Sequence, residues 1–217
     1  SKAQPPTRWS ETEGVVWKAS IPGRGWSSPV IDGQQIWLST AHETAAKAED
    51  VKRRLGANTA DQPLVLLQKV DLHALCVDRN TGKILRDIRL FSEQEPQWVH
   101  ELNSYASPTP VLESGRAYFH FGTFGTACLD TRSGKVLWTN TSLHIMHENG
   151  PGSSPILWKD RLIFHLDGSD SQSIVAVEQD GAVVRRDSKN GLPLETLSAF
   201  GTNNHGLLFS PSGRLLV

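Results

Sequence analysis

The chain has 217 residues and a formal net charge of −1, with 22 Lys and Arg balanced by 23 Asp and Glu. This balance excludes the strongly basic surface typical of a nucleic-acid-binding domain. No apolar run approaches the ~18 residues of a membrane-spanning helix, and 2 Cys are too few for a disulfide-rich scaffold. With 18 Gly, 12 Pro and 7 Trp between short apolar runs, the composition predicts an all-β protein of small repeated units.

The first repeated unit opens with a hairpin pattern over residues 25–38, in which a polar turn separates two short apolar strands. A strand–turn–strand pattern follows at 75–85, where Asp78 can accept bonds from backbone N–H groups and Gly82 can supply a positive φ. Residues 41–68 lie between the two patterns and are rich in helix-forming residues, which predicts a helical insertion in this unit.

Both patterns recur later in the chain. Hairpin patterns lie at 107–120 and 151–164, and strand–turn–strand patterns at 127–138 and, more weakly, at 174–184. Four strands per unit and a period of about 50 residues are typical of a β-propeller blade. The three predicted blades cover approximately residues 15–90, 98–140 and 147–187.

Residues 188–217 fit the repeat poorly and are predicted to be an irregular tail or a partial blade, with one hairpin pattern at 208–217. Two interpretations stay open: a divergent last blade, or a reading frame that shifts near Glu178. Three blades are fewer than the roughly four to eight that close a ring. We therefore expect an incomplete propeller whose end blades present open strand edges.

The repeat resembles a known family. The Ser-Pro-Val hairpin, followed by Cys-Val-Asp-Arg-Asn-Thr-Gly-Lys at 76–83 and Cys-Leu-Asp-Thr-Arg-Ser-Gly-Lys-Val-Leu-Trp at 128–138, is similar to the pyrrolo-quinoline-quinone-like (PQQ-like) β-propeller repeat. The segments 23–30 and 102–111 resemble the planctomycete-type members of that family in particular. The resemblance implies an all-β, PQQ-like propeller and an extracytoplasmic location, periplasmic or secreted, with any signal peptide removed.

The same repeat is used by quinoprotein dehydrogenases and by non-catalytic scaffolds. By resemblance, a dehydrogenase would need Ca²⁺, a catalytic Asp, a Trp beneath the quinone and commonly a vicinal Cys pair, whereas Cys76 and Cys128 lie far apart in the sequence. We therefore predict a non-catalytic binding or scaffolding module without PQQ or calcium, which binds a protein or carbohydrate partner and self-associates through its open edges. The alternative is a fragment of a quinone-dependent oxidoreductase whose catalytic blades lie elsewhere.

Candidate ligand contacts fall in two groups, and no catalytic residue is assigned. The first group lies in segments that precede blades one and two, at the predicted binding face of the propeller: Arg24, Trp26, Asn103 and Tyr105. The second group is His120 and His165, each ten residues after its hairpin proline, where equivalent strands converge on the channel. No third ligand accompanies the two histidines in the sequence, so no metal site is predicted.

Overall fold

The computed structural model describes residues 7–56, 62–179, 181–187, 193–197, 208–209 and 215–216. Blade one is a four-stranded antiparallel sheet whose order follows the chain. Its strands are β1 (Val30–Asp32), β2 (Gln35–Ala45), β4 (Leu67–Asp78) and β5 (Ile84–Gln94).

Blade two repeats this arrangement with shorter strands, and a 3₁₀ turn, η1 (Gly122–Phe124), joins its central pair. Its strands are β7 (Val111–Glu113), β8 (Arg116–His120), β9 (Thr126–Asp130) and β10 (Val136–Asn140). Blade three has five strands, β11 (Ile156–Trp158), β12 (Arg161–Asp167), β13 (Gln172–Val177), β14 (Val183–Asp187) and β15 (Pro193–Leu197).

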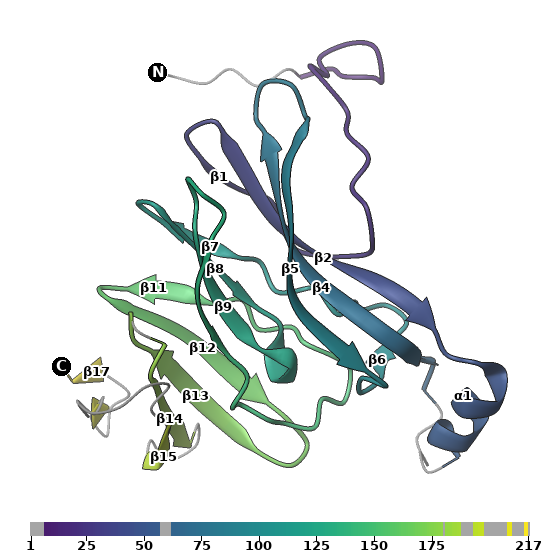
Figure 1. Cartoon of the computed structure of the whole chain (residues 1–217), viewed down its shortest axis with the longest axis vertical. Coiled ribbons are helices and arrows are strands. Elements are labelled where there is room, and N and C mark those ends of the chain that lie inside the picture. The colour runs from purple at the N-terminus through teal and green to yellow at the C-terminus, as the bar shows by residue number, and fades with distance from the viewer. Residues whose placement is uncertain are drawn as a thin grey trace.

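The predicted fold class is confirmed. In the part of the chain that the structure describes, the three sheets stand side by side as an open array, and α1 projects beyond one end of it (Figure 1). This arrangement is that of an incomplete β-propeller. Two minor pairs complete the described strands, β3 (Leu64–Val65) with β6 (Val99–His100) and β16 (Leu208–Phe209) with β17 (Leu215–Leu216).

Two features differ from the sequence prediction. The stretch 41–68 is helical only over α1 (Ala48–Leu55), because the β2–β4 ladder continues from Gln35↔Asp78 to Ala45↔Leu67 and takes in both of its ends. The segment 193–197, within the predicted irregular tail or partial blade, adds a fifth strand to blade three by pairing with β14, with a register shift between Arg185 and Arg186. The pairing of β16 with β17 agrees with the hairpin pattern at 208–217, and the remaining residues of the predicted tail lie outside the described ones.

The strand-linking turns form as the sequence predicts. Asp78 Oδ1 accepts hydrogen bonds from the N–H groups of Asn80 and Thr81 at 3.0 and 2.8 Å. Asp130 Oδ1 accepts from the N–H of Ser133 at 2.7 Å. Hydrogen bonds from the Thr81 and Ser133 hydroxyls lower the pKa of both aspartates, so these carboxylates are part of the turns.

Blades pack face to face through their apolar residues. Successive side chains of β8 point to opposite faces of its sheet. Phe119 packs with Trp37 of blade one, at 6.1 Å between ring centroids. Tyr118 lies in the second core cluster with Phe164 of blade three. Blade two is thereby buried on both faces. Among the described residues no helix is long and apolar enough to cross a membrane.

Candidate functional site: a pocket between blades two and three

A pocket of about 200 Å³ opens where the ends of β8 and β12 meet the loop that leads into blade three. Three histidines contribute to its wall, together with small residues and one carboxylate. It is lined by His120, Gly122, Ile145, His147, Gly150, Gly152, Ser153, His165, Leu166 and Asp167. The two histidines that the sequence singled out, His120 and His165, therefore line the same pocket.

His120 is buried at the end of β8. Its Nδ1 lies 2.9 Å from Thr126 Oγ1, a bond set by the register that pairs the two residues across β8 and β9. Its ring stacks on Phe164, with 3.9 Å between ring centroids. Burial, with the neighbouring imidazoles of His147 and His165, lowers the pKa of His120 to about 3, so this ring is neutral at pH 7. Its buried Nε2 has no hydrogen-bond partner among the described residues.

His147 reaches the pocket from the loop between blades two and three. Its Nε2 accepts the backbone N–H of Thr123 at 3.0 Å, which places the ring proton on Nδ1. A Cβ on Gly122, whose φ is +60°, would lie 2.5 Å from this Nε2, so glycine is required for the contact. Burial lowers the pKa of His147 to about 4, against an opposing effect of Asp170. The second ring is therefore also neutral at pH 7.

The outer wall of the pocket is more open and carries charge. His165 Nδ1 lies 2.8 Å from Asp167 Oδ2, and both side chains are more than half exposed. The N–H of His165 donates to Ser153 Oγ at 3.2 Å. A second hollow of about 270 Å³ shares Gly150 and Asp167 with the pocket, so a ligand longer than one small group has room to extend past Asp167.

Arg24 and Asn103 connect the segments that precede the three blades. The Arg24 guanidinium donates to the carbonyl oxygens of Glu101 and Asn103 at 2.6 and 2.9 Å. Asn103 Nδ2 donates to the carbonyl oxygens of Asn149 and Pro151 at 2.7 and 3.3 Å, in the loop that borders the pocket. The structure thus gives both side chains a role in positioning the loop, and the predicted ligand contact of Arg24 and Asn103 stays a prediction.

The other two predicted contacts lie apart from the pocket. Tyr105 is fully buried, and its hydroxyl donates to the carbonyl oxygen of Gln97 at 2.7 Å, so it differs from the predicted ligand contact because its ring packs in the core. Trp26 is 57% exposed, with the Arg24 guanidinium carbon 5.6 Å from its ring centroid. Neither residue lines the pocket.

Sequence reasoning did not connect His147 and Asp167 with the two predicted histidines. His147 lies on a loop whose path is set by contacts to Gln97 and Thr123, which are distant in sequence. Asp167 had a weak signal, since it lies two residues after His165 on the same strand and therefore on the same face of the sheet.

The chemistry of this pocket is that of polar binding. Two neutral imidazoles, the Ser153 hydroxyl and the Asp167 carboxylate present hydrogen-bonding groups around a small cavity with Ile145 and Leu166 in its wall. Among its described residues, the pocket holds no group of three metal-ligating side chains with ligand atoms within 4.8 Å of one another. In the described part of the chain, such a group lies on blade one.

Comparisons with known proteins give matches among solved structures alone. No family model and no curated protein matches the sequence. Among solved structures, BamB from Moraxella catarrhalis is similar at a TM-score of 0.41 and 12% sequence identity, over 92% of this chain and 62% of that one. The chain therefore spans less than two thirds of the length of that structure.

Proposed function

We propose that the chain is a non-catalytic binding module of the β-propeller class, and that the pocket between blades two and three takes a neutral, hydroxyl-rich ligand such as a carbohydrate. The observation that carries the proposal is the unpartnered Nε2 of His120, buried in the pocket wall. A buried polar atom without a partner costs free energy that a ligand hydrogen bond would recover.

The charge of the pocket supports a neutral ligand. His120 and His147 carry no charge at pH 7, so they offer hydrogen bonds without attracting an anion. Asp167 adds acceptor oxygens, which suit hydroxyl donors and disfavour carboxylates or phosphates. The cavity of about 200 Å³ fits one sugar-sized group, and the adjoining hollow offers room for a second.

The test is a titration monitored by the imidazole ¹⁵N resonances of the three pocket histidines. The probes are glucose, N-acetylglucosamine and cellobiose. At least one should shift the His120 resonances saturably, and Asp167→Asn should weaken that binding by about tenfold, the loss of one charge-assisted hydrogen bond. Asp160→Asn, at the exposed tip of the β11–β12 hairpin, is the matched control and should leave binding unchanged.

Two results would overturn this function. The first is unchanged His120 resonances with all three sugars up to their solubility limits. The second is a saturable shift produced by PQQ with Ca²⁺, which would favour the oxidoreductase alternative. The extracytoplasmic location belongs to the same proposal and rests on the resemblance of the repeats. It is tested by probing cytosolic and envelope fractions of the native host with an antibody to the chain.

A further inference from the structure

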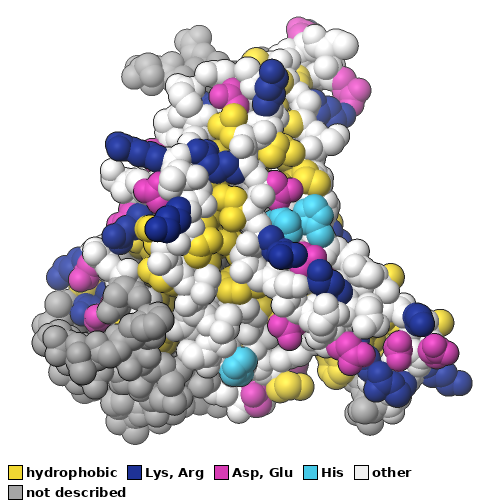
Figure 2. Space-filling view, viewed as in Figure 1, with side chains coloured by type: hydrophobic (Ala, Val, Ile, Leu, Met, Phe, Trp, Pro, Cys, Tyr) yellow, Lys and Arg dark blue, Asp and Glu magenta, His cyan; other side chains and the backbone are white. Residues whose placement is uncertain are grey.

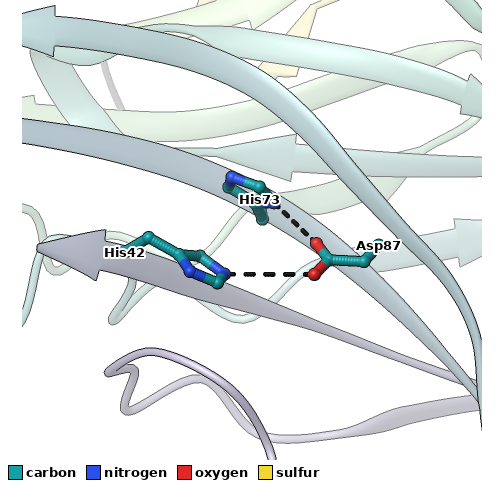
Figure 3. A group of neighbouring side chains, drawn as sticks. All are labelled: His42, His73 and Asp87. Atoms are coloured by element: carbon teal, nitrogen blue, oxygen red, sulfur yellow. Dashed lines mark hydrogen bonds and ion pairs between the residues drawn. The ribbon is translucent and has the colours of Figure 1, made fainter.

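His42, His73 and Asp87 converge on one face of blade one, far in sequence from the pocket histidines. They come from three adjacent strands, β2, β4 and β5. His73 Nδ1 lies 2.6 Å from Asp87 Oδ1, and His42 Nε2 lies 4.0 Å from Asp87 Oδ2, so both rings are directed at one carboxylate (Figure 3). One ligand atom from each residue lies within 4.8 Å of the other two.

Hydrogen bonding within the protein leaves this group incomplete. His42 Nε2 is a buried atom with no hydrogen-bond partner among the described residues. The two imidazole rings lie 4.3 Å apart between centroids. The two rings lie against each other, and the unpaired nitrogen of His42 faces the carboxylate that His73 also contacts. The three side chains are therefore arranged as ligands around one shared position.

The repeat itself does not require these residues. By the alignment that equates Ser39 with His120 and Cys76 with Cys128, the equivalent positions in blade two hold Thr123, Gly125 and Thr139. Thr139 lies in β10, whereas Thr123 and Gly125 lie in and directly after η1, past the ends of the shorter central strands, so blade two forms its sheet without an imidazole or carboxylate at these positions. The cluster is therefore specific to blade one, whose central strands are longer.

The charges around the cluster do not block a cation. Asp71 pairs with His42 in the β2–β4 register. Its carboxylate lies 2.7 Å from the Lys69 ammonium and 4.0 Å from the Arg89 guanidinium, so both basic side chains are paired with an acid other than Asp87. The side chains of His42 and Asp87 are each 38% exposed, and Figure 2 shows histidine side chains at the surface in this view, with acidic and basic side chains beside them. A hydrated ion can therefore reach the cluster from solvent.

We propose that His42, His73 and Asp87 form a binding site for a divalent transition-metal ion of the zinc class. Imidazole nitrogen and carboxylate oxygen are the ligands that such ions prefer, and three protein ligands leave a fourth position for water. Since the ligands lie on three strands, the ion cross-links β2, β4 and β5. This site is independent of the sugar-binding pocket.

The primary test is titration of the metal-free protein with Zn²⁺ by calorimetry, and with Co²⁺ by visible absorption. We expect one equivalent to bind, with the visible bands of Co²⁺ in a low-coordinate nitrogen–oxygen site. His42→Ala and His73→Ala should each weaken Zn²⁺ binding at least tenfold. His144→Ala, at an exposed histidine outside both sites, is the matched control and should bind as the parent does.

A second measurement keeps the test valid if a variant fails to fold. In the unsubstituted protein, one equivalent of Zn²⁺ should shift the imidazole ¹⁵N resonances of His42 and His73 and leave those of His144 in place. The absence of saturable binding, or binding that both alanine variants retain, would overturn the site. So would Zn²⁺ shifts confined to the pocket histidines.

Discussion

The backbone N–H of Thr109 donates a 2.9 Å hydrogen bond to the hydroxyl oxygen of Ser154, which precedes the hairpin proline of the next blade. The N–H of Ser28 makes the equivalent bond to Thr109 Oγ1 at 3.0 Å. Ser28 and Thr109, each directly before a hairpin proline, thus join their blades to the next one. The hydroxyl oxygen at this position accepts a backbone N–H from the preceding blade. This bond gives a physical reason for the Ser-Pro and Thr-Pro pairs of the repeat.

Removing the acceptor hydroxyl should loosen the contact between two blades. We expect Ser154→Ala to lower the free energy of unfolding by about 0.5–1 kcal/mol, because the N–H of Thr109 then loses its protein acceptor. Ser28→Ala is the matched control, since no bond to the Ser28 hydroxyl is seen among the described residues, and its effect should be near zero. Urea unfolding measures both. Equal losses would contradict the role of Ser154.

Two tryptophans dock on the turn that links the third and fourth strands of a blade. The Trp138 indole N–H donates to the carbonyl oxygen of Gln179 at 3.0 Å, and that of Trp17 donates to Arg79 at 2.9 Å. A Cβ on Gly82, whose φ is +71°, would lie 2.5 Å from the Trp17 ring. The segment around Trp17 therefore packs on blade one as Trp138 packs on blade three.

Gly82→Ala should therefore destabilise the protein more than its backbone conformation alone requires. Gly115 has a similar φ of +81°, with nothing within 4 Å of an added Cβ. Gly115→Ala should cost about 1 kcal/mol for the left-handed backbone, and Gly82→Ala at least 1 kcal/mol more, because the Trp17 ring must move. Thermal unfolding of the two variants measures the difference. Matching melting temperatures would show that Trp17 does not dock on this turn.

These contacts show what the sequence can predict. The turn at Asp78 is encoded locally, because its carboxylate bonds to residues two and three positions on, so the repeat and the blades were predictable. The His42, His73 and Asp87 cluster was not, because it depends on the register of three strands separated by an insertion. Sequence spacing carries no signal for residues that meet only through non-local pairing.

The proposed absence of a quinone cofactor is testable by fluorescence. Stacking of PQQ on an indole would quench tryptophan emission. Trp37 is fully buried, and Trp26, one of two exposed indoles with Trp9, has a face occupied by Arg24, which is itself held by Glu101 and Asn103. We expect PQQ with Ca²⁺ to lower the emission only as far as it lowers that of free N-acetyltryptophanamide. A saturable, Ca²⁺-dependent quench beyond that control would contradict the non-catalytic proposal.

The buried histidines make stability depend on pH. Folding lowers the pKa of His120 to about 3 and that of His147 to about 4, from an ordinary value of 6.5. Below pH 6.5 the unfolded chain therefore binds protons that the folded chain does not, and stability falls by about 1.4 kcal/mol per pH unit for each histidine. Urea midpoints measured between pH 7 and 4 should show this loss. The amide oxygen of the His147→Gln variant can still accept the Thr123 N–H. This variant should reduce the slope of unfolding free energy against pH by the equivalent of about one proton. An unchanged slope would rule out burial of a neutral His147 as its cause.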